Sequence, residues 1–113
     1  DDTLEENLLN VLNSPRSELF VIEAEGELVA TAIVNIYQKA GYKEARLDDV
    51  VVDEASRGKG YARQIVTEAI EWAQSHGASS VELTSSADRI AANRLYQSMG
   101  FELRETNVYK LRF

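Results

Sequence analysis

The chain has 113 residues and a mass of 12.6 kDa, which is the size of one domain, and we expect residues 1–113 to fold as a single unit. Hydrophobic residues make up 44% and charged residues 27% of the sequence, the balance of an ordinary globular domain. Cysteine is absent, which excludes disulfides and cysteine nucleophiles, and the single histidine, His76, excludes a histidine-rich metal cage. We therefore expect no metal site.

The net charge is −7, from 12 basic and 19 acidic residues. Such a surface repels nucleic acid and anionic membranes and favours cationic small molecules, although acidity can also serve solubility alone. The longest uncharged apolar-rich run, residues 28–37, is too short to span a bilayer, and the acidic start of the chain is unlike a signal peptide. We therefore expect a cytoplasmic protein that binds neither nucleic acid nor membrane.

The first half of the chain predicts one helix and then three strands. Thr3 and Glu6 have the spacing of a capping box, and the leucines that follow share one helical face until Pro15 stops the helix. Two apolar runs predict a hairpin, and a third run with three consecutive valines predicts a central strand covered on both faces. These strands are expected at residues 19–24, 28–37 and 46–53, with a loop at 39–44 before the third.

The second half predicts two helices with a strand between them. Residues 62–73 carry apolar side chains three and four positions apart, the strongest helical pattern in the chain. Residues 80–85 alternate like a strand, Asp88 can cap a second helix, and residues 101–113 alternate again as one bent or two short strands. A strand–helix–strand unit requires a parallel pair. The expected fold class is therefore α/β, with a mixed, mostly antiparallel sheet and helices on both faces.

The junction between the third strand and the long helix has the composition of a phosphate-binding loop. Its sequence is Arg57-Gly58-Lys59-Gly60-Tyr61-Ala62. Two glycines let the backbone turn sharply and leave its N–H groups unobstructed, and a helix start adds free N–H groups with a partial positive charge. The spacing fits neither the Walker A motif nor the dinucleotide fingerprint. A plain glycine-containing connection remains the alternative.

This loop resembles the pyrophosphate loop of the GCN5-related N-acetyltransferase (GNAT) family, Q/R-x-x-G-x-G/A. Residues 91–101 resemble the family's late motif, a helix that carries L-Y-x-x-x-G-F, and the order of elements also agrees. The resemblance implies the GNAT-like acyl-CoA N-acyltransferase fold. Members usually have a further strand and helix ahead of the point where this sequence starts, and neither is represented in it.

The resemblance also implies an activity. It is the transfer of the acetyl group of acetyl-CoA, as co-substrate, directly to a primary amine of a small molecule or peptide. A catalytically inactive CoA-binding or regulatory module of the same fold is the alternative, and a homodimer is compatible with either.

Residue roles follow from the same resemblance. The strand backbone at Val50, Val51 and Val52 would pair with the pantetheine arm, and the glycine loop would hold the pyrophosphate through its amides. Tyr96 matches the tyrosine that protonates the leaving thiolate, and Asn93, one turn earlier, is a possible cofactor contact. Core packing is the alternative for the valines and for Tyr96.

Asp48 and Asp49 are the candidates for the general base, because a carboxylate beside the cofactor could accept the proton of the ammonium group. Their sequence resembles the Glu-Asp-Val stretch of the amino-sugar acetyltransferases in the family. Solvated aspartates at the end of the sheet are the alternative. Strand alternation places Leu47, Asp49 and Val51 on one face and the residues between them on the other.

A bulge near this point in the family separates two strands and opens a V-shaped slot. The resemblance therefore implies a break in pairing between residues 50–52 and the next parallel strand, with all three valines largely buried.

Overall fold

The computed structural model describes residues 2–113, with side chains from Thr3 onward. In chain order the elements are α1 (Asp2–Asn13), β1 (Ser17–Ala24), β2 (Glu27–Lys39), β3 (Tyr42–Val52), a 3-10 turn (Glu54–Ser56), α2 (Tyr61–Ser75), β4 (Ala78–Glu82) and α3 (Ile90–Ser98). The strands form one sheet in the order β1-β2-β3-β4, antiparallel except for the parallel pair β3–β4. The predicted mixed sheet is confirmed.

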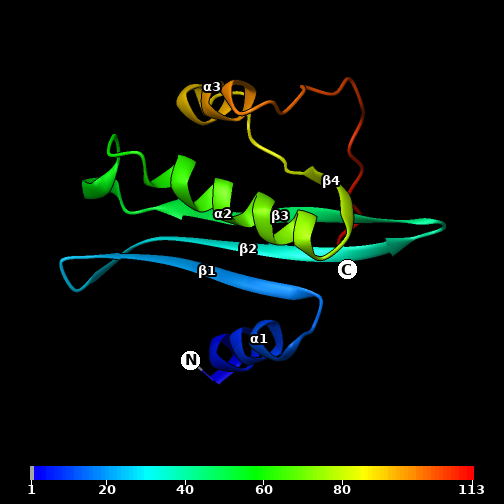
Figure 1. Ribbon diagram of the computed structural model, residues 1–113, viewed down its shortest axis with the longest axis horizontal. Coiled ribbons are helices and arrows are strands. Elements are labelled where there is room, and N and C mark those ends of the chain that lie inside the picture. The colour runs from blue at the N-terminus through cyan, green and yellow to red at the C-terminus, as the bar shows by residue number, and fades with distance from the viewer. Residues whose placement is uncertain (1) are drawn as a thin grey trace.

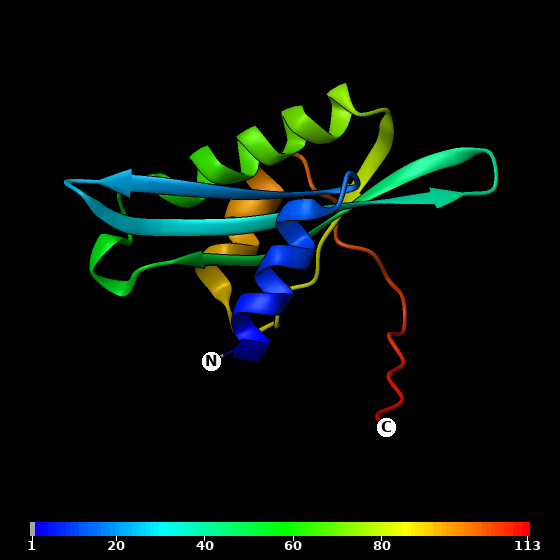
Figure 2. The same cartoon turned by 90° about the horizontal axis from the view of Figure 1, so that it is seen from below.

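Helices cover both faces of the sheet, as the sequence predicts. Helix α1 lies on one face against β1, and α2 crosses the opposite face, with α3 on the same side as α2 (Figures 1 and 2). The core lies between the sheet and α2, where Val34, Ile65 and Val66 are completely buried. Within residues 2–113, no helix has the length and apolarity needed to cross a bilayer.

The expected loop at residues 39–44 is instead the tip of a long hairpin. Strand β2 runs to Lys39 and β3 starts at Tyr42, so that only two residues form the turn. Gly41 supplies a φ of 90°, and such two-residue turns require positive φ. The Gln38 amide donates to the carbonyls of Lys39 and Tyr42, which closes the end of the hairpin. The ends of both strands at this tip are mostly polar, so a pattern of apolar residues does not predict them.

Strand β3 contains a β-bulge at Asp49. Two of its residues, Asp49 and Val50, face the single residue Ala32 of β2, because Ile33 pairs with Asp48 while Thr31 pairs with Val51. Asp49 has a φ of 52°, the left-handed conformation of the first residue of one common bulge type. A bulge inserts one residue into the alternation, so every side chain beyond it changes face.

That change of face corrects two expectations. Leu47 is buried, but Val51 is 57% exposed and does not share its face. Val50 and Val52 take the inward positions instead and pack, partly buried, against the core. The expectation that all three valines are largely buried is therefore wrong for Val51.

The expected break between β3 and β4 is present. Strand β4 pairs with β3 only at Lys43, Ala45 and Arg46, and it ends at Glu82. From Leu47 to the end of β3 no residue has a partner in β4, so this edge of β3 is open. The predicted strand spans 80–85, whereas β4 starts earlier, at Ala78, and ends at Glu82. Residues 83–85 no longer pair with β3.

Three further predictions are corrected. Residues 101–113 form no strand, because the segment runs away from the sheet and pairs with no strand of it (Figure 2). Its large side chains, among them Tyr109 and Phe113, are consequently exposed to solvent. Helix α3 starts at Ile90 after Arg89, without a side-chain cap from Asp88. Helix α1 starts at Asp2, so Thr3 lies inside the helix rather than capping it.

The left-handed conformation of Asp49 gives a test of the bulge. A β-branched residue is poorly tolerated at positive φ, so Asp49→Val should lower the free energy of unfolding by about 1–2 kcal/mol in urea titrations. Asp53→Val is the matched control, because Asp53 is also exposed but has an ordinary φ of −53°. The control should stay within about 0.5 kcal/mol of the wild type. Equal losses in both variants would contradict the bulge.

Candidate functional site

The glycine loop projects into solvent between the end of β3 and the start of α2. Arg57 folds back so that its Nε donates to the carbonyl of Val52 at 3.4 Å. Gly58 and Gly60 have φ values of 80° and 85°, which most side chains avoid, and a Cβ on either would meet nothing within 4 Å. The loop therefore combines a glycine-dependent backbone with open space in front of it.

Backbone N–H groups concentrate at this loop. The first hydrogen bond of α2 runs from the amide of Gln64 to the carbonyl of Gly60, at 3.1 Å. The amides of Tyr61, Ala62 and Arg63 precede that bond and have no acceptor within the helix. Such a cluster, at the positive end of a helix, binds anionic oxygens. The amides make an anion site possible although the whole chain carries a net charge of −7.

The cations of the loop differ in their partners. Lys59 is exposed, whereas the Arg63 guanidinium donates to the Ser98 hydroxyl at 2.8 Å. That bond ties the first turn of α2 to the last turn of α3. Arg63 therefore links α3 to the helix that follows the loop, a contact that the sequence pattern did not indicate.

The open edge of β3 lies next to the loop. Val50 and Val52 send their side chains to the core, so their backbone is held in place while one edge of the strand lacks a neighbour. An extended ligand can add to such an edge in the way that a further strand would. The core packing expected for the valines is present at Val50 and Val52, and a ligand contact through their backbone stays a prediction.

Tyr96 belongs to the same cluster of side chains as Val50 and Val52. It is 6% exposed and its ring lies edge-on to Phe101, with ring centroids 5.8 Å apart. Burial raises the pKa of the Tyr96 hydroxyl above its ordinary value of 10.0, and the positive charge of Arg89 partly opposes that rise. Among the described residues none hydrogen-bonds this hydroxyl. The hydroxyl is thus protonated at neutral pH and available to a ligand.

Asn93 is occupied by its own chain. Its amide nitrogen donates to the carbonyls of Ser86, at 2.9 Å, and Arg89, at 2.8 Å. Both carbonyls belong to the segment that connects β4 to α3. The side chain therefore shapes this connection, and only its oxygen is left for a cofactor.

The two aspartates have different environments. The carboxylate of Asp48 accepts hydrogen bonds from Asn35 Nδ2 at 3.2 Å and from Arg46 Nε at 3.3 Å. Both of its oxygens are therefore used, in an ion pair whose side chains are about one third exposed and which contributes at most about 1 kcal/mol. Asp49 is exposed at the bulge. Both aspartates lie in the part of β3 that is not paired with β4, and of the two only the Asp49 carboxylate is without a hydrogen-bond partner among the described residues.

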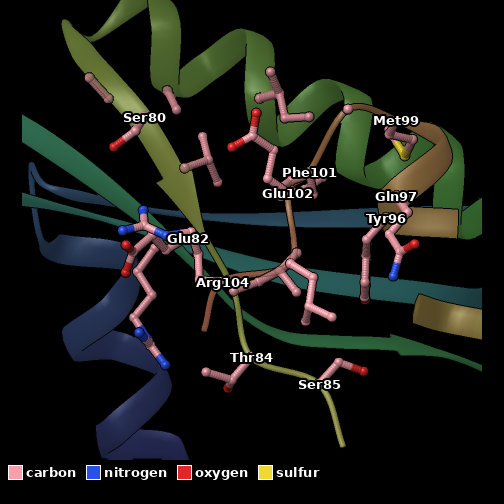
Figure 3. A pocket seen from close by; sticks show the side chains of 18 of the residues that line it. Ser80, Glu82, Thr84, Ser85, Tyr96, Gln97, Met99, Phe101, Glu102 and Arg104 are labelled. Atoms are coloured by element: carbon pink, nitrogen blue, oxygen red, sulfur yellow. The ribbon is translucent and has the colours of Figure 1, made fainter. Parts of the chain in front are cut away.

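A hollow of about 770 Å³ lies between β4, the end of α2, α3 and residues 101–108 (Figure 3). It is lined by Tyr96 and Asn93 but not by the glycine loop. Its wall also includes Ser85, whose Oγ is buried without a hydrogen-bond partner. The sequence pattern alone did not indicate a role for Ser85. This residue could have been found as the polar third member of an inward-facing alternation that begins with Val81 and Leu83.

Comparison with known proteins agrees with this geometry. Residues 1–101 match the acetyltransferase (GNAT) family. The chain is 31% identical over 90 residues to the N-acetylaspartate synthetase of Rattus norvegicus, a match that covers 80% of this chain and 29% of that protein. The chain therefore spans less than a third of the length of this curated relative.

Two solved structures are similar over almost the whole chain. A transcriptional regulator from Bacillus halodurans superposes with a TM-score of 0.91 and 26% identity, covering 100% of this chain and 77% of that one. A putative acetyltransferase from Agrobacterium tumefaciens superposes with a TM-score of 0.86 and 30% identity, covering 97% of this chain and 78% of that one.

Proposed function

We propose, from the premise that this chain belongs to the acetyltransferase (GNAT) family, that it transfers the acetyl group of acetyl-CoA to a primary amine. One observation carries the proposal: an exposed loop with two left-handed glycines follows a strand whose last residues have separated from their neighbour. The first feature suits a pyrophosphate and the second suits the extended arm of the same molecule.

The loop and the strand edge would bind different parts of acetyl-CoA. The amides of the glycine loop and of the first turn of α2 would hold the pyrophosphate, with Arg57 and Lys59 adding positive charge. The open backbone edge at Val50 and Val52 would pair with the pantetheine amides. In this proposal the thioester would lie near Tyr96, which belongs to the core cluster against which these valines pack.

Transfer requires one proton to leave the amine and one to reach the sulfur. The amine nitrogen bonds to the thioester carbon as the carbon–sulfur bond breaks, and Tyr96 would supply the proton to the departing thiolate. The Tyr96 hydroxyl is protonated at neutral pH, since burial raises its pKa above the ordinary value of 10.0, and it therefore carries the proton that this role requires. We assign acceptance of the amine proton to Asp49, directly or through water, since the oxygens of Asp48 already accept two hydrogen bonds.

The acceptor is proposed to be a small-molecule or peptide amine. The similarity to a protein named N-acetylaspartate synthetase supports a small molecule. The net charge of −7 also attracts amines, which are cationic until they lose a proton.

A second candidate function is a CoA-binding regulatory module without turnover. The solved structure described as a transcriptional regulator favours keeping this candidate, because it superposes on 100% of the chain. Both candidates require acetyl-CoA to bind, and only the first requires a free thiol to be released.

Cofactor binding can be tested at Gly60. Gly60→Asp adds a negative side chain at a left-handed position in front of the amides, and should abolish the rise in melting temperature that acetyl-CoA causes. For the wild type that rise corresponds to about 2.7 kcal/mol at one hundred times the dissociation constant.

Gly41→Asp is the matched control for this variant. Gly41 is also left-handed, at 90°, with open space around it, but it lies at the tip of the β2–β3 hairpin. Both variants carry the same charge and similar backbone strain, so the control should retain the full shift. A Gly60→Asp protein that also retains it would show that the loop does not hold the pyrophosphate.

Turnover can be tested at Tyr96. Tyr96→Phe removes only a hydroxyl that no residue in 3–113 hydrogen-bonds, so the fold and the acetyl-CoA shift should persist. Release of free CoA in the presence of amines should fall by about 10²- to 10⁴-fold. Because burial raises the pKa of Tyr96, the alkaline loss of wild-type activity that depends on this proton should lie above pH 10.0. Normal turnover in the variant would remove Tyr96 from the reaction.

A further inference from the structure

Ser85 carries the one buried side-chain oxygen or nitrogen in residues 3–113 that lacks a hydrogen-bond partner. Native proteins satisfy nearly all such groups, because an unpaired buried hydroxyl loses its bonds to water and gains nothing in return. No residue that the structure describes supplies a partner for Ser85, which leaves its hydroxyl for water or a bound ligand.

The hydroxyl is held in a fixed place. Ser85 follows β4 where the chain has turned away from β3, on the same inward face as Val81 and Leu83. The next residue, Ser86, is anchored by the Asn93 amide through its carbonyl. Ser85 consequently sits on a braced segment, although this segment is neither strand nor helix.

Ser85 and Tyr96 share one hollow. Both line it, and both lie on the right of the close-up view, with Ser80 across from them (Figure 3). The Tyr96 hydroxyl also has no partner among the described residues. Ser85 and Tyr96 therefore line one hollow, and neither hydroxyl has a hydrogen-bond partner among the described residues, so that a ligand in this hollow can contact both residues.

We propose that the Ser85 hydroxyl donates a hydrogen bond to the carbonyl oxygen of the acetyl thioester. This inference rests on the proposed function, in which Tyr96 faces the sulfur, since the carbonyl oxygen is the next polar atom of that group. A fixed donor at this oxygen orients the thioester for attack, and its bond strengthens as negative charge develops on the oxygen.

The test compares acetyl-CoA with CoA, which lacks only the acetyl group. In calorimetric titrations, Ser85→Ala should weaken the binding of acetyl-CoA about fivefold, the usual effect of one neutral hydrogen bond, and leave the binding of CoA unchanged. The free variant should be as stable as the wild type or more stable, because no protein bond is lost. Ser80→Ala is the control: Ser80 lines the same hollow but is exposed, and its loss should change neither affinity.

Each other outcome overturns the inference. Unchanged affinity for acetyl-CoA would assign the partner of Ser85 to water. An equal loss for CoA would place the hydroxyl on another part of the cofactor, and a less stable free variant would make Ser85 structural. A wild-type chain that binds neither ligand would overturn the proposed function together with this inference, so the two failures are distinguishable.

Discussion

The bulge at Asp49 is the constraint on which the site depends. Without the extra residue, β3 would keep its alternation, with Val51 against the core and Val50 turned outward. With it, Val50 and Val52 anchor the end of the strand from the inside, and Val51 is exposed. Bulges also bend and twist the strand that carries them. The parallel pairing of β3 with β4 ends just before the bulge, at Arg46, which leaves an open edge directly ahead of the glycine loop.

The elements around this edge are tied together by few but specific bonds. Arg57 holds the loop to the end of β3, Arg63 joins the start of α2 to α3, and Asn93 braces the connection that leads into α3. These bonds connect the loop, the start of α2 and the segment that leads into α3, the helix that carries Tyr96. Because the proposed anion site consists of backbone amides and a helix end, it would not require a basic surface and is compatible with an acidic chain.

Sequence reasoning succeeded where the signal was local. The apolar spacing of α2 and the two glycines before it are properties of consecutive residues, and the predicted helix and loop are present. The bulge was expected from the family resemblance alone, because Asp48 and Asp49 are both polar and an inserted polar residue leaves no break in the apolar pattern. The segment at 101–113 alternates as a strand does, but a strand exists only with a partner edge, which no local pattern supplies. Ser85 became visible only once burial and hydrogen bonding were known together.

The central claim is that the edge opened by the bulge and the glycine loop form one binding site for acetyl-CoA. The most direct measurement is the change in backbone amide chemical shifts of this chain during a titration with acetyl-CoA. We expect the changes to concentrate at residues 50–52 and 57–62 and around Ser85 and Tyr96, while those of α1 and β1 stay small. Changes confined to residues 101–108 and the outer edge of β4, or none at millimolar ligand, would contradict the account.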